Sequence, residues 1–177
     1  MEISKAKKNL ICRRILLGAV ILILSLIQNG AGGFLKIGSV GPLLLIPAVV
    51  AAGMYEGEIS GVFYGLFAGA LWDLFAKGNN FNAIFLVVVG YVCALLIQTI
   101  MRNNFVTHLL LSSAFTVIYC AGYWLYHFVL ADLDSAFVTL LKFYLPMAIF
   151  TCILSTPVFL LIRFIERRLP TSQYFDE

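Results

Sequence analysis

The most informative stretch of this chain reads Gly61-Val62-Phe63-Tyr64-Gly65-Leu66-Phe67-Ala68-Gly69-Ala70-Leu71-Trp72-Asp73. Its glycines and its aspartate recur every four residues, so on a helix they lie along one face. In water, each glycine inside a helix costs about 1 kcal/mol relative to alanine. In a bilayer the backbone must form a helix in any case, and small residues let a second backbone approach closely. The stretch therefore predicts a membrane helix with a packing groove and a carboxylate at its end.

The whole chain is too apolar for a soluble protein. Of its 177 residues, 62% are hydrophobic and only 12% are charged, and the mean hydropathy is +0.98. A soluble domain is about 45–50% apolar and about 25% charged. We therefore predict an all-α, polytopic membrane protein in which residues 1–177 form a single membrane-embedded domain. The segments left outside the membrane are too short to hold a soluble catalytic domain.

Six segments are apolar enough to cross a bilayer, which takes about 20 residues, with a range of about 17–25. The predicted transmembrane helices are 11–27, 40–55, 59–75, 81–101, 106–130 and 137–162. Glycine, asparagine or charged residues occupy the turns between them. The second and third spans are joined by a very short turn, which predicts an antiparallel hairpin.

Basic residues gather at the two ends of the chain. Lys5, Lys7, Lys8, Arg13 and Arg14 come before or at the start of the first span, and Arg163, Arg167 and Arg168 follow the last. With six spans, both ends lie on the same side, and the positive-inside rule places both termini in the cytoplasm. The basic and then apolar N-terminus is similar to a signal peptide, but no convincing small-x-small cleavage site precedes a soluble domain. We expect a retained first helix.

Asp73 is predicted near the outer end of the third span, where a carboxylate is costly. It either pairs at the interface with Lys77, one turn later, or faces inward and organises a polar pocket or a partner contact. Its alignment with the glycines favours the inward position. His127 and Lys142 are predicted at the same depth, so these four residues form a candidate outward polar cluster or pocket. Snorkelling of Lys142 to the interface is the alternative.

Patterns for catalysis and metal binding are missing from the sequence. His108 and His127 are far apart and have no carboxylate at i+3 or i+4, so we predict no metal site. The four cysteines form no CxxC pair and are expected to be small buried hydrophobes. No HExxH, GxSxG or Walker pattern occurs. The basic residues flank spans without interleaved aromatics. We expect no enzyme, no cofactor and no nucleic-acid partner.

The glycine-rich helix resembles that of the MreD family of bacterial rod shape-determining membrane proteins. The shared pattern is G-x-x-x-G-L-x-x-G-x-x-x-D, filled here by Gly61, Gly65, Leu66, Gly69 and Asp73, with a short turn and another long apolar helix after it. The resemblance is strongest over residues 43–101. It implies a non-catalytic, multi-pass scaffold or regulator of cell-wall elongation in the cytoplasmic (inner) membrane, acting in rod shape determination and peptidoglycan synthesis. The implied partners are an MreC-type bitopic shape protein, a RodA-type transglycosylase with its penicillin-binding transpeptidase, MreB filaments and membrane lipid.

Two alternatives stay open at this point. The MreD fold is thought to be similar to the S-components of energy-coupling-factor transporters, which implies a substrate-binding subunit for a vitamin or other small molecule as the alternative function. Such a subunit needs an outward pocket, for which Asp73, His127 and Lys142 are the candidates. The glycines Gly61, Gly65 and Gly69 form a helix-packing or partner-binding face. That face is used either inside the protein, against the second or fourth helix, or outside it, against a partner's transmembrane helix.

Overall fold

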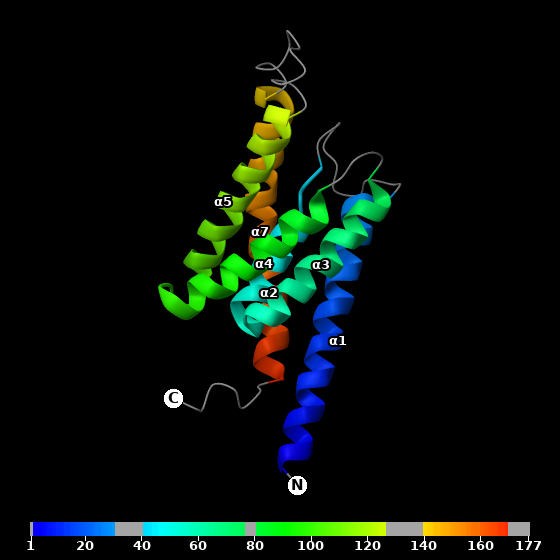
Figure 1. Cartoon of the computed structure of the whole chain (residues 1–177), viewed down its shortest axis with the longest axis vertical. Helices are drawn as coiled ribbons and strands as arrows, with labels where there is room; N and C mark the ends of the chain where they lie inside the picture. The colour runs from blue at the N-terminus through cyan, green and yellow to red at the C-terminus, as the bar shows by residue number, and fades with distance from the viewer. Residues whose placement is uncertain (1, 31–40, 77–80, 127–139, 170–177) are drawn as a thin grey trace.

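The structure is a computed structural model that describes residues 2–30, 41–76, 81–126 and 140–169, with side chains from Lys8 onward. These residues form helices and no strand. Helix α1 begins and helix α7 ends at the same end of the bundle (Figure 1). The helices are α1 (Glu2–Asn29), α2 (Leu45–Glu56), α3 (Glu58–Phe75), α4 (Asn82–Thr99), α5 (Phe105–Trp124), the short π-helix η2 (Leu140–Tyr144) and α7 (Leu145–Arg168).

Four stretches among the described residues are long and apolar enough to span a membrane, namely 8–29, 82–99, 105–124 and 140–168. Helix α2 is apolar, but its 12 residues extend over only about 18 Å, against a hydrocarbon thickness of about 30 Å. Helix α3 carries Glu58 and Asp73 at its ends and is not among the four. The all-helical fold class is confirmed for the described residues, whereas the prediction of six spans is supported for four helices.

Helix α2 forms the centre of the bundle. Every residue from Leu45 to Met54 is buried, and the helix packs against α1, α3, α4, α5 and α7. Figure 1 shows it in the middle of the view, between α5 and α1. The predicted segment 40–55 extended too far at its start, because Pro42 lies before the helix and Pro47 in its first turn, where proline is tolerated. The second predicted span is thus a short core helix.

The most extensive helix pair joins α3 to α4. A Cβ atom added to Gly61 would lie 2.6 Å from the carbonyl oxygen of Gly90, and one added to Gly65 would lie 2.7 Å from the carbonyl carbon of Leu86. Gly69 meets the backbone of the first turn of α4 in the same way. Cβ atoms do not approach backbone so closely. The glycine face of α3 is therefore occupied by α4 of the same chain.

A single residue, Gly57, connects α2 to α3. Its φ of +84° lies in the region that favours glycine. Because the connection is so short, α2 and α3 fold back and pack on each other, as expected for the predicted hairpin. The turn also places Glu56 at the end of α2 beside α1, which determines the charged contacts described below.

The first prediction compares two glycines of the apolar helices. Replacing Gly65 with alanine forces a Cβ into the α4 backbone, so we expect a loss of about 1–3 kcal/mol of stability, despite the better helix propensity of alanine. Gly18 of α1 is the matched control, because an added Cβ meets nothing within 4 Å there. Thermal unfolding of both variants in detergent measures the difference. A Gly65→Ala protein as stable as Gly18→Ala contradicts the close packing.

Candidate functional site

A group of charged side chains is buried where α1, α2 and α7 meet. The Nε atom of Arg13 lies 2.6 Å from Oε1 of Glu56, and its Nη1 atom lies 3.0 Å from Oε2 of Glu166. The exposed fractions of these three side chains are only 3%, 1% and 7%. A single guanidinium thus holds the carboxylates of two other helices. We call Arg13, Arg14, Glu56 and Glu166 the ion cluster.

Arg14 forms the exposed edge of the ion cluster. Its Nε atom lies 3.6 Å from Oε2 of Glu56, and its side chain is 49% exposed. Its Nη2 atom donates a hydrogen bond of 3.3 Å to Oγ of Ser60 on α3. Glu56 therefore directs each carboxylate oxygen at a different arginine. The positive charges of two arginines neutralise the negative charges of two glutamates. This pairing offsets the cost of burying charge, since an unpaired buried charge is strongly unfavourable.

Two buried polar atoms beside these ion pairs have no hydrogen-bond partner among the described residues. They are Oε1 of Glu166 and the hydroxyl oxygen of Tyr64. Tyr64 lies on α3 and is only 8% exposed. An unsatisfied buried polar group costs about 1–3 kcal/mol, and buried water is the usual partner of such groups. These two atoms can therefore still form hydrogen bonds, with water or with another polar group.

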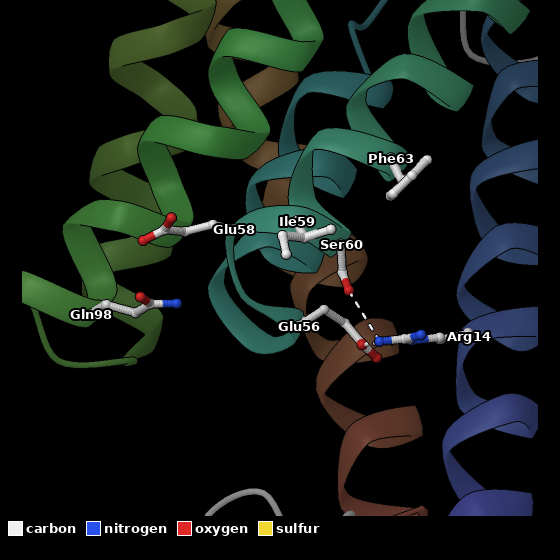
Figure 2. Close-up of a pocket in the computed structure, with 7 residues that line it drawn as sticks. All are labelled: Arg14, Glu56, Glu58, Ile59, Ser60, Phe63 and Gln98. Carbon is white, nitrogen blue, oxygen red and sulfur yellow. Dashed lines mark hydrogen bonds and ion pairs between the residues drawn. The ribbon is translucent and has the colours of Figure 1, made fainter.

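A pocket of about 440 Å³ opens beside the ion cluster. Figure 2 shows Arg14 on its α1 side, bonded to Ser60, with Glu58 and Gln98 on the opposite side. Ile59 and Phe63 contribute an apolar surface and are 77% and 66% exposed. The pocket therefore combines positive, negative and apolar side chains within one small space.

Asp73 makes one contact that the sequence did not suggest. Its Oδ2 atom accepts a hydrogen bond of 3.1 Å from the backbone N–H of Ala83, in the first turn of α4. A carboxylate there satisfies a free helix N–H and is stabilised by the helix dipole. Lys77 and His127 lie outside the described residues. Lys142 is exposed on η2 and makes no ion pair within the described ranges. The predicted outward cluster stays a prediction.

Aromatic rings gather close to Asp73. The ring of Tyr119 on α5 lies 5.1 Å from Trp72 and 5.2 Å from Phe85, between ring centroids. Its hydroxyl donates a hydrogen bond of 2.7 Å to Oδ1 of Asn82 on α4. Ring packing and one polar contact therefore connect α5 to α3 and α4 at this end of the bundle.

Helices α5 and α7, which pack against each other, carry a group of buried polar residues. His108 is fully buried and stacks on Phe159, with 4.6 Å between ring centroids. Neither ring nitrogen of His108 nor Oγ of Ser112 has a hydrogen-bond partner in the described parts of the chain. Within those parts, no group of three histidine, cysteine or acidic residues could hold a metal ion. The fully buried polar residues of the two helices are His108, Ser112 and Thr116 on α5, and Thr151 and Ser155 on α7.

Sequence reasoning missed the ion cluster. It assigned Arg13 to membrane orientation and Glu56 to a turn, and it gave Glu166 no role. One signal was present: Arg13 lies within the apolar part of α1, which begins at Lys8. A charged residue inside a membrane segment usually faces the protein interior and has a partner. The nearest apolar helix that ends in a carboxylate is α2, with Glu56 at its last position.

The second prediction concerns Arg13. The substitution Arg13→Gln leaves two buried carboxylates without their cation, so we expect a loss of about 3–5 kcal/mol of stability. Adding Glu56→Gln and Glu166→Gln removes that charge and should recover part of the loss. Arg102→Gln is the control, because Arg102 is exposed. Thermal unfolding in detergent ranks the variants. Equal stability of Arg13→Gln and Arg102→Gln argues against a buried ion pair.

The third prediction concerns the cap of α4. Asp73→Ala removes the acceptor for the Ala83 N–H and should cost about 1 kcal/mol. Asp73→Asn keeps an acceptor oxygen at the same position, so it should lose less. Unfolding midpoints of the two variants measure the effect. If the asparagine variant is as unstable as the alanine variant, the negative charge of Asp73 matters more than its hydrogen bond.

Comparisons with known proteins give no match for this chain. No family model matches it. No curated protein and no solved structure matches it either. The residues and their geometry are therefore what support a function.

Proposed function

We propose that this protein is a non-catalytic scaffold or regulator of the cell-wall elongation machinery, of the MreD type, in the cytoplasmic membrane of a bacterium. The proposal begins from the pattern of Gly61, Gly65, Leu66, Gly69 and Asp73. It is compatible with the four helices that are long and apolar enough to span a membrane. A scaffold of this kind acts through its surfaces, by holding partner helices in the membrane.

The observation that best supports a scaffold role is that α4 fills the glycine face of α3. Gly61, Gly65 and Gly69 lie against the backbone of α4, and Asp73 caps the same helix. The residues that resemble the family thus build a closely packed α3–α4 pair that contacts the buried helix α2. A closely packed core of this kind suits a protein whose work is to present fixed outer faces.

A partner helix would then bind to an outer surface and not to the glycine face. Gly18 on α1 and Gly122 on α5 both lie in open space, with nothing within 4 Å of an added Cβ. Large apolar side chains are exposed around both glycines. They include Ile15, Leu22 and Ile23 on α1, and Val117, Ile118 and Leu125 beside Gly122. Small residues among apolar ones let a second transmembrane helix approach closely.

The alternative function is the substrate-binding subunit of a small-molecule transporter. The aromatic group around Tyr119, with its hydrogen bond to Asn82, favours it, because aromatic side chains with a few polar groups are the residues that typically line sites for such ligands. The candidate ligand contacts named from the sequence, Asp73, His127 and Lys142, belong to this alternative. Mass spectrometry of small molecules released from the purified protein distinguishes it, since a retained vitamin supports the transporter function.

The fourth prediction is an association in the membrane. An MreC-type bitopic protein, expressed with this chain, should co-purify with it from detergent-solubilised membranes. We expect Gly18→Leu or Gly122→Leu to weaken the association while the protein stays folded, because both positions face outward. Gly65→Leu should instead lose folding and association together, since its side chain has no space.

Two results would contradict this proposal. One is a folded wild-type protein that retains no component of the elongation machinery, whether MreC-type, RodA-type or the transpeptidase. The other is a Gly65→Leu variant that keeps both its fold and its partner, which would also overturn the assignment of the glycine face to α4. Size-exclusion chromatography of each variant separates loss of folding from loss of binding.

A further inference from the structure

We propose that the pocket lined by α1, α3, α4 and Glu56 of α2 binds the headgroup of an aminophospholipid, with the phosphate at Arg14 and Ser60 and the primary ammonium at Glu58 and Gln98. The site follows from the pocket and its lining side chains, and it does not depend on the proposed role in wall elongation. Figure 2 shows Arg14 and Ser60 on the α1 side and Glu58 and Gln98 on the α4 side, with Ile59 between the two pairs and Phe63 above Ser60.

The phosphate side is formed by Arg14. Among the described residues, its guanidinium makes two polar contacts: a 3.6 Å ion pair with Glu56 and a 3.3 Å hydrogen bond to Ser60. A guanidinium has five N–H donors in a planar fork, so donors remain for a phosphate. The Ser60 hydroxyl can donate a further hydrogen bond to the same phosphate. With half of its side chain exposed, Arg14 is accessible to a ligand, whereas Arg13 is not.

The ammonium side is formed by Glu58. This carboxylate lines the pocket and makes no ion pair within the parts of the chain that the structure describes. The side-chain amide of Gln98 stands close to the same turn, since an added Cβ at Gly57 would lie 3.5 Å from its nitrogen. A carboxylate and an amide oxygen together accept N–H bonds from a primary ammonium, and the charge makes those bonds stronger.

The apolar part of the pocket fits the start of an acyl chain. Ile59 and Phe63 lie one helical turn apart on the outer face of α3, and both are mostly exposed. Arg14 lies six residues inside the apolar stretch of α1 that begins at Lys8, which is about 9 Å along a helix. Arginine side chains near the end of a membrane span commonly extend toward lipid phosphates.

The charges of the pocket distinguish between lipid classes. Phosphatidylglycerol has no cation to offer Glu58, so it would use only the Arg14 side. Phosphatidylcholine has a quaternary ammonium without N–H donors, and such groups prefer aromatic cages, whereas Phe63 is the single aromatic residue that lines this pocket. Phosphatidylethanolamine satisfies both sides, because its phosphate and its primary ammonium are joined by a short two-carbon link.

The experiment uses the full-length protein in nanodiscs of phosphatidylcholine doped with phosphatidylethanolamine or, separately, with phosphatidylglycerol. Native mass spectrometry counts the lipid that stays bound after release from the disc. We expect phosphatidylethanolamine to be retained preferentially. Arg14→Gln should weaken retention of both doped lipids by about tenfold, the loss expected for one charged hydrogen-bonded contact. Glu58→Gln should weaken only phosphatidylethanolamine and so remove the preference. Gln98→Leu should reduce the preference more mildly.

Arg102→Gln is the matched control, because this arginine is also exposed but does not line the pocket. The proposal is overturned if the three lipids are retained equally, or if Arg102→Gln has the same effect as Arg14→Gln. It is also overturned if Glu58→Gln and Gln98→Leu both leave the preference intact. Glycerophosphoethanolamine, the soluble headgroup, is the competitor: if it displaces the lipid at equal concentration, the occupant is a soluble phosphoethanolamine compound and not a membrane lipid.

Discussion

The close approach of α3 to α4 is the constraint on which the rest of this structure depends. Three glycines on α3 and Gly90 on α4 remove the side chains that would keep the two backbones apart. With the two helices in contact, α2 packs against both, and its residues from Leu45 to Met54 are buried. The same contact brings the end of α3 beside the first turn of α4, so that Asp73 reaches the free N–H of Ala83.

The two ends of the hairpin formed by α2 and α3 are held by different physical means. At the turn, charge dominates, because Glu56 reaches back to two arginines of α1 while Arg13 also binds Glu166. At the far end of α3, the helix cap formed by Asp73 and tilted, packed aromatic rings hold the helices instead. Ion pairs that are shielded from water are sensitive to the loss of either partner, because the remaining buried charge is then unpaired. Ring packing tolerates small shifts, since its energy is spread over many weak contacts.

Much of the local structure could be predicted from the sequence, because its causes are local. The third helix was predicted over 59–75 and is found over Glu58–Phe75, since its glycine period and flanking charges lie within the segment itself. Helix α2 was predicted as a span because it is apolar on all sides, and that pattern does not distinguish a span from a buried core helix. The spacing of the glycines defined a packing face but not which helix would fill it.

The ion cluster lay beyond prediction for a different reason. Arg13 and Glu56 are 43 residues apart, and Glu166 comes from the last helix. No spacing rule relates positions on separate helices, so only the packed bundle reveals the pairing. His108 is similar, because its isolation from carboxylates was visible in the sequence, whereas its stacking on Phe159 was not. To predict the cap formed by Asp73, one would have to know that α4 starts beside the end of α3.

The position of Arg13 has a consequence for how the protein is made. Helix α1 is synthesised before α2, which carries Glu56, and before α7, which carries Glu166. An arginine in the apolar part of α1 gains its first carboxylate when α2 has been synthesised and its second only when α7 has joined the bundle. Helix α1 thus carries a buried cation whose second partner is made more than a hundred residues later.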